Sequence, residues 1–312
     1  MVGCRGPMCS GSSSPGGSRL EADMKSHTDL SQQDLFISGQ NGYHTYRIPA
    51  IIATTQGTLL AFCEGRTSCS SDTGDIDIVS RRSFDGGLTW TPMQVVTDMG
   101  QDTIGNPCPV VDHATGTIWL PLCWNARLGP ESQIVIGRAQ RTVWLCKSTD
   151  DGASWTAPVE ITQQVKRPEW RWYATGPGHG VQLADGRLVV PCDFSAGDPD
   201  PEHNHLGSHV IFSDDHGASW QIGGVIHGRV EECAVAPLGD GRLYLNMRAR
   251  HGLNRRAVAW STDDGMTWSP VTLDQALVEP ICQAGVQALG GQRVLFSNPA
   301  STQRENLTVR LS

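Results

Sequence analysis

Arg47 is the first residue of this chain whose type suggests chemistry, because its charge interrupts an otherwise apolar segment. The run Tyr46-Arg-Ile-Pro-Ala-Ile-Ile52 has the composition of a strand that is covered on both faces. Arginine is rarely buried without an anionic partner. We therefore expect either a structural Asp or Glu, the usual partner of a buried arginine, or an anionic ligand beside Arg47.

Two other segments contain residues that bind metals or phosphates in other proteins, and neither has the complete pattern. His203 and His205 lack a third ligand at a suitable spacing, which favours a solvated loop over a metal site. The segment Gly176-Pro-Gly-His-Gly180 lacks both phosphate-binding glycine signatures, and no helical pattern follows it. We therefore predict no metal site and no phosphate loop.

A repeated motif indicates which elements position the charged residues. The pattern S-x-D-x-G-x-[ST]-W occurs four times, beginning at Ser83, Ser148, Ser213 and Ser261. Each copy follows a strand-like run. Its D-x-G core predicts a hairpin turn in which Asp bonds the turn's own amides and Gly supplies a positive φ, while the Trp packs on the hairpin. We therefore assign a structural role to the motif aspartates, Asp85, Asp150, Asp215 and Asp263.

Repeated antiparallel hairpins without helical periodicity favour an all-β propeller over a β-sandwich. The final run Asn306-Leu-Thr-Val-Arg-Leu-Ser312 predicts one more strand, which ends on the first letter of a fifth motif. We interpret the chain as cut short, with residues 35–312 forming the propeller domain and its last blade incomplete. Residues 1–34 are rich in Gly, Ser and Pro, so we expect a disordered leader, with Met24 as an alternative start.

Composition narrows the classes of partner. The formal net charge of −8 argues against nucleic acid or an anionic membrane surface, so an anionic substrate would need a local arginine cluster. No stretch approaches the roughly 18 apolar residues of a transmembrane helix, and no secretory signal is visible. The ten cysteines include no C-x-x-C pair, and most lie in strand-like runs, so we expect reduced, buried thiols and a cytoplasmic protein.

Several segments in order resemble the exo-α-sialidases (neuraminidases) with a six-bladed propeller. They are the Y-R-I-P run, the four aspartate motifs, Tyr173-Ala-Thr-Gly-Pro-Gly-His-Gly180, Glu231-Glu-Cys233 ahead of Leu245-Asn-Met-Arg248, and Phe296-Ser-Asn-Pro-Ala300 ahead of Arg304. The resemblance runs from about residue 35 to the end. It looks closest to the branch that contains the cytosolic and lysosomal animal enzymes and their bacterial relatives.

The resemblance implies an arginine triad that binds the sugar's carboxylate, and the triad falls on Arg47, Arg248 and Arg304. Sialic acid carries a carboxylate on its anomeric carbon, which the planar fork of arginine matches in a bidentate manner. Arg250 is a rival of Arg248 because residues two apart point to the same face of a strand. Arg310 is a rival of Arg304.

The resemblance also implies the groups beside the triad. Arg66 resembles a further arginine of the pocket, and Asp72 lies in the loop where the family has its acid/base aspartate. Asp75 competes with Asp72 for this role, whereas Asp77 lies in a strand and is assigned to structure. Asn106 and Gln283 stand where the family supplies polar contacts to the sugar.

The implied nucleophile is a tyrosine, because an attacking carboxylate would be repelled by the sugar's own carboxylate. Its base falls on Glu232, with Glu231 as a competitor that would point to the opposite face of a strand. The four tyrosines, Tyr43, Tyr46, Tyr173 and Tyr244, all lie in motifs with other roles in the family. We expect the nucleophile in a region that this chain lacks.

Three functional hypotheses follow. The first is a retaining exo-α-sialidase that removes terminal sialic acid from glycoproteins, glycolipids or oligosaccharides, without metal or organic cofactor. The second is a sialic-acid-binding propeller fragment without the tyrosine nucleophile. The third is a structural module in which the arginines pair with Asp72 and Glu232. Linkage preference and oligomeric state stay open.

Overall fold

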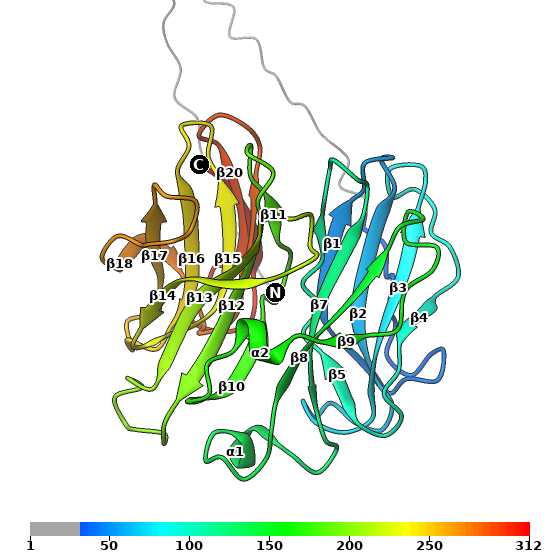
Figure 1. Ribbon diagram of the computed structural model, residues 1–312, viewed down its shortest axis with the longest axis horizontal. Helices are drawn as coiled ribbons and strands as arrows, with labels where there is room; N and C mark the ends of the chain where they lie inside the picture. The colour runs from blue at the N-terminus through cyan, green and yellow to red at the C-terminus, as the bar shows by residue number, and fades with distance from the viewer. Residues whose placement is uncertain (1–31) are drawn as a thin grey trace, which may run out of the picture. The chain divides into compact units, whose positions relative to one another are not determined.

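The computed structural model describes residues 32–312, and nearly all of its regular structure is β-strand (Figure 1). Residues Leu35–Ser312 form one compact unit. The expected leader, residues 1–34, lies outside the described residues except for its last three positions. None of the helices within residues 32–312 has the length and apolar character of a membrane span.

The first sheet, coloured blue to green in Figure 1, contains nine strands. A single parallel pairing, Ile76 with Thr103, joins its two antiparallel groups. The strands are β1 (Thr45–Ala53), β2 (Leu59–Arg66), β3 (Ile76–Ser83), β4 (Gln94–Thr97), β5 (Thr103–Gly105), β6 (Val110–Val111), β7 (Ile118–Asn125), β8 (Thr142–Ser148) and β9 (Val159–Glu160).

Three further antiparallel sheets follow in chain order. The second sheet comprises β10 (Trp170–Thr175), β11 (Val181–Gln182), β12 (Leu188–Ala196), β13 (Leu206–Ser213) and β14 (Gln221–His227). The third comprises β15 (Val230–Pro237), β16 (Leu243–Ala249), β17 (Arg255–Ser261) and β18 (Thr272–Val278). The fourth comprises β19 (Gly285–Ala288), β20 (Val294–Pro299) and β21 (Leu307–Leu311), and the short helices are α1 (Glu131–Ile134) and α2 (Thr162–Val165).

The repeated aspartate motif forms the expected turn. In its first copy, Asp85 Oδ1 accepts hydrogen bonds from Ser83 Oγ and from the Thr89 amide, both at 2.8 Å. Gly87 has a φ of 93°. The four copies join β3 to β4, β8 to β9, β13 to β14 and β17 to β18. The structural role predicted for the motif aspartates is therefore confirmed.

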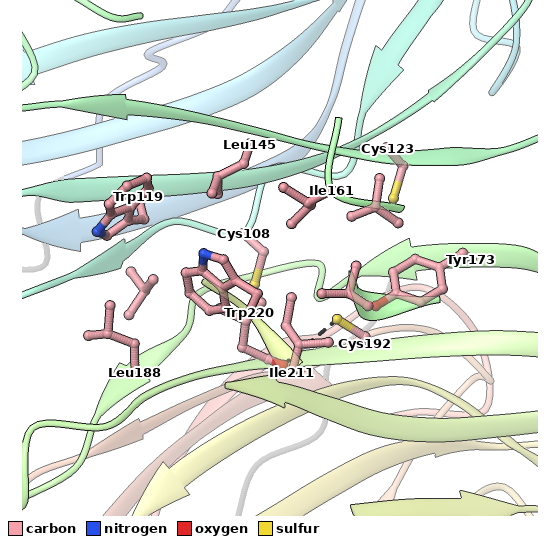
Figure 2. Close-up of a cluster of buried hydrophobic side chains, with 14 of the residues drawn as sticks. Cys108, Trp119, Cys123, Leu145, Ile161, Tyr173, Leu188, Cys192, Ile211 and Trp220 are labelled. Atoms are coloured by element: carbon pink, nitrogen blue, oxygen red, sulfur yellow. Dashed lines mark hydrogen bonds between the residues drawn. The ribbon is translucent and has the colours of Figure 1, made fainter. Parts of the chain in front are cut away.

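Three hydrophobic clusters lie between consecutive sheets, and a fourth joins β2 and β3 to β7 within the first sheet. One cluster combines Trp119 and Cys123 of β7 with Tyr173 of β10 and Cys192 of β12 (Figure 2). Similar clusters join β13 to β15 and β16, and β15 and β16 to β19 and β20. This stacking of antiparallel sheets is the arrangement of consecutive propeller blades.

The cysteines of the described residues are free thiols. Six of the eight are buried, as predicted for strand and core positions. The other two are Cys69, which is exposed, and Cys282, which is partly buried. Burial raises the pKa of the Cys63 thiol to about 12, so this group stays protonated and unreactive at neutral pH.

Candidate active site

A polar cavity of about 360 Å³ is lined by side chains from all four sheets and their loops. Seven of the eight predicted site residues line it: Arg47, Arg66, Asp72, Asn106, Glu232, Arg248 and Arg304. The structure does not bring Gln283 into this cavity. Its side-chain amide donates to the backbone oxygens of Pro177, at 2.6 Å, and Cys233, at 3.0 Å.

Arg47 enters the cavity at an irregular point of β1. The pairing with β2 shifts between Arg47 and Ala50, and Ile48 has a φ of 58°. A β-branched residue rarely adopts this conformation, which costs on the order of 1–3 kcal/mol and persists where the surroundings impose it. The guanidinium of Arg47 donates to Asp72 Oδ1 at 2.7 Å. The anion expected beside Arg47 is thus a carboxylate of this chain in the free protein.

Asp72 is the loop carboxylate that faces the cavity. Its Oδ1 lies 2.7 Å from Arg47 Nη1 and 2.7 Å from Arg66 Nη2, while its side chain stays 62% exposed. Arg66 is buried and also donates to Glu64 and to the Ser70 backbone oxygen. The two cations hold the Asp72 side chain at the edge of the cavity, within reach of both ligand and solvent.

The two competing aspartates lie elsewhere. Asp77 accepts a hydrogen bond from Tyr43 at 2.6 Å, and burial raises the pKa of Asp77 to about 6. Asp75 lines a different cavity of about 340 Å³ and does not line the main one. Asp72 is therefore the one of the three that can act on a ligand in the main cavity.

Glu231 and Glu232 both line the cavity, although strand alternation predicted opposite faces for them. The pairing of β15 with β16 shifts between Val230 and Cys233, and this irregularity breaks the alternation. The expectation for Glu231 was therefore wrong.

Each glutamate of this pair binds an arginine of β16 or its C-terminal extension. Arg248 Nη1 lies 2.6 Å from Glu232 Oε2, and Arg250 Nε lies 2.9 Å from Glu231 Oε1. Arg248 also forms an ion pair with Glu231. Both arginines face the cavity, as predicted for residues two positions apart. Arg250 is therefore a second cation of the cavity beside Arg248.

Arg304 differs from the other arginines of the proposed triad because it has no ion partner. It lies in the loop between β20 and β21, is exposed, and forms no hydrogen bond or ion pair within residues 32–312. Its rival Arg310 donates to Asn298 Oδ1 at 3.0 Å and does not line the cavity. The geometry thus favours Arg304 as the cation available to an incoming anion.

Several cavity residues had no counterpart in the sequence-based predictions. Asp193 of β12 is buried, and burial together with the charges of Glu232 and Glu231 raises its pKa well above the ordinary value. Its sequence signal is a carboxylate inside the apolar run Leu188-Val-Val-Pro-Cys-Asp-Phe194, the same signal that identified Arg47. The other missed residues include Glu131, Arg141, Trp172 and Phe194.

His205 was assigned to a solvated loop, yet its side chain is only 9% exposed and lines the cavity. Its Nδ1 lies 3.3 Å from Asp200 Oδ2. Within residues 32–312, no group of three His, Cys, Asp or Glu side chains is arranged to hold a metal ion. We assign His205 to the polar wall of the cavity.

None of the four tyrosines of the chain lines the cavity. Tyr43 donates to Asp77, and Tyr46 donates to the Gln40 backbone oxygen at 3.0 Å. Tyr173 is buried in the core of Figure 2. The phenol of Tyr244 accepts a hydrogen bond from Asn246.

Comparisons with known proteins agree with this geometry. A family model described as "BNR repeat-like domain" matches residues 57–312. A sialidase from Bacteroides fragilis is 33% identical over 300 residues, covering 88% of this chain and 54% of that protein. An exo-alpha-sialidase from Aspergillus fumigatus is 33% identical over 296 residues, covering 87% of this chain and 68% of the relative.

The solved structure of the Hadza microbial sialidase Hz136 superimposes with a TM-score of 0.80 at 33% identity, covering 88% of this chain and 57% of that one. The chain thus spans between about half and about two thirds of the length of these relatives. The family model matches residues 57–312, and each of the two relatives matches more than four fifths of the chain at 33% identity. The chain therefore belongs to the sialidase family with BNR repeats.

Proposed function

We propose that this protein binds a terminal α-linked sialic acid and hydrolyses its glycosidic bond, releasing the sugar from glycoproteins, glycolipids or oligosaccharides. The observation that carries the proposal is the convergence of Arg47, Arg248 and Arg304 with Asp72 and Glu232 on one cavity. The sialidase relatives support it. No cofactor enters the proposed reaction.

The arginines supply a site for the sugar's carboxylate. Each guanidinium has five N–H donors, so Arg47 and Arg248 keep free donors after pairing with Asp72 and Glu232. These pairs are also what a purely structural role predicts. We favour ligand binding because the Arg47 and Asp72 side chains are 36% and 62% exposed, and because Arg304 has no hydrogen-bond or ion-pair partner among residues 32–312.

The proposed reaction retains the configuration of the anomeric carbon. Asp72 donates a proton to the leaving glycosidic oxygen and later removes one from the attacking water. Glu232 acts as the base for a tyrosine nucleophile, which forms the covalent glycosyl intermediate that water then cleaves. Before the tyrosine is engaged, Arg248 holds Glu232 in place through the 2.6 Å contact.

A second function, sialic acid binding without turnover, is favoured by the absence of tyrosine from the cavity wall within residues 32–312. We propose that the tyrosine belongs to a part of the propeller outside these 312 residues, which would also complete six blades. The incomplete coverage of the relatives supports this. We further propose a cytoplasmic location, which the free thiols support.

Hydrolysis of a fluorogenic sialoside distinguishes the two functions. The 312-residue chain is compared with a chimaera that adds the C-terminal part of the Bacteroides fragilis relative, and Asp72→Ala in the chimaera is the control. Turnover by the chimaera alone supports a sialidase whose nucleophile lies outside this sequence. Absence of turnover in both overturns the hydrolase proposal. Turnover by the short chain shows that our account of the nucleophile is wrong.

A further inference from the structure

Arg141 is a buried cation of the cavity wall that forms no ion pair with a carboxylate within residues 32–312. Its side chain is 3% exposed, and it directly precedes β8. Every hydrogen bond that its guanidinium makes within residues 32–312 goes to a neutral oxygen. The other buried cavity arginine, Arg66, pairs with Glu64 and Asp72. Burying an unpaired charge is unfavourable unless its donors are well satisfied, so the contacts of Arg141 call for a specific explanation.

These contacts fix the plane of the Arg141 guanidinium. Its Nε donates to the Tyr173 backbone oxygen at 2.6 Å, Nη1 donates to Asn125 Oδ1, and Nη2 donates to Asn106 Oδ1. One face stacks on the Trp172 ring, 4.1 Å from its centroid. Both Asn106 and Trp172 line the cavity. Arg141 therefore lies beside two residues that face a ligand, and its own donors are directed at oxygens of the protein.

The contact with Arg141 determines which way the Asn106 amide is turned. Arginine has donors only, so the Asn106 atom that faces it must be the amide oxygen, and the NH₂ group takes the other position. The backbone of Asn106 is fixed as well, because its N–H donates to Glu64 Oε1 at 2.9 Å and its carbonyl accepts from Thr175 Oγ1 at 2.6 Å. What Asn106 offers to a ligand is therefore a pair of N–H donors.

We propose that Arg141 is a positioning residue that locks the Asn106 amide with its N–H donors toward the substrate. This part of the cavity then selects a hydroxyl or carbonyl oxygen of the sugar that accepts a hydrogen bond. The inference rests on the proposed sialic acid site. It adds that Arg141 acts through Asn106 and not through its own charge.

A double-mutant cycle tests this assignment by the affinity for free N-acetylneuraminic acid, measured by calorimetry, which requires no turnover. Asn106→Ala and Arg141→Met each weaken binding about fivefold to tenfold, the loss expected for one hydrogen bond. The affinity of the double variant is at most about tenfold weaker than that of the wild type, because both changes remove the same contact. Arg138→Met, at an exposed arginine on the same segment, is the control. Losses that multiply, or no loss with Arg141→Met, would overturn the inference.

A stability measurement tests the contact itself without a ligand. Asn106→Asp replaces the amide by a carboxylate, which pairs with Arg141 and raises the midpoint of thermal unfolding. In the Arg141→Met background the same change lowers the midpoint, because the buried carboxylate then has no cation. An equal shift in both backgrounds would show that the two residues do not interact. If the unmodified chain fails to bind the sugar, the proposed function fails, while this measurement still decides the link between Arg141 and Asn106.

Discussion

His209 of β13 makes the stability of this fold depend on pH in a direction that can be worked out. Its ring is fully buried against Trp170 and Phe194 of the second sheet. Its Nδ1 donates to the Val210 backbone oxygen at 3.1 Å, and its Nε2 has no partner in the described structure. Burial lowers the pKa of His209 to about 3, so the ring is neutral in the folded protein at pH 5–7.

The sign and size of the effect follow from proton binding by the two states. Between pH 6.5 and about pH 3 the unfolded chain holds a proton at this position that the folded chain does not. The contribution of His209 to the free energy of unfolding therefore falls as the pH falls, by about 1.4 kcal/mol per pH unit. Acidification from about pH 6.5 to about pH 5 reduces the free energy of unfolding by about 2 kcal/mol through this residue alone.

Substitution of His209 by Asn removes the titration while keeping a donor for the Val210 oxygen. Urea unfolding is followed by tryptophan fluorescence between pH 7.5 and 5 in the wild type, in His209→Asn and in His113→Asn, a control at an exposed histidine. The wild type loses about 2 kcal/mol more than His209→Asn between pH 6.5 and 5. Parallel curves for these two proteins would refute the argument from burial.

Three other substitutions test the cavity and its supports by urea unfolding. The raised pKa of Asp193 makes the wild type lose stability as the pH rises above about 4, at about 1.4 kcal/mol per pH unit. Asp193→Asn lacks this loss, so its free energy of unfolding should rise relative to that of the wild type over the same range. Parallel pH curves for the two proteins would contradict this. Gly105→Ala costs about 1–3 kcal/mol because its Cβ would lie 2.5 Å from Glu64 Oε1, and an unchanged midpoint would exclude that clash. Glu279→Gln leaves the fully buried Arg256 without its anion and lowers the free energy of unfolding by about 3–5 kcal/mol. A decrease below about 1 kcal/mol would show that the ion pair is dispensable.

Local patterns in the sequence predicted much of the fold because each pattern has a local physical cause. The aspartate motif specifies its own turn through side-chain bonds to neighbouring amides, so four hairpins could be placed without knowledge of the rest of the chain. The apolar runs ahead of the motifs became β3, β8, β13 and β17. Closure into six blades depends on contacts between distant segments and stays a prediction.

The candidate site was predictable where a charge stood inside an apolar run or a family motif, as at Arg47 and Arg248. Glu231 was misplaced because an irregularity in strand pairing cannot be recognised from alternation alone. Arg141 was missed because its partners Asn106, Asn125 and Tyr173 come from separate segments. Roles that rest on long-range contacts of this kind are not visible in sequence spacing.

The central claim is that the cavity arginines bind the carboxylate of sialic acid, and Arg304 tests it most directly. Because Arg304 is exposed and makes no hydrogen bond or ion pair in the described part of the chain, Arg304→Met removes a ligand contact without breaking a hydrogen bond or ion pair of that part. Calorimetric titration with N-acetylneuraminic acid should show binding that Arg304→Met weakens about tenfold to a hundredfold, the loss of a charge-assisted hydrogen bond, and that Arg310→Met leaves unchanged. Equal affinities of the wild type and Arg304→Met, or no binding at all, would contradict the account.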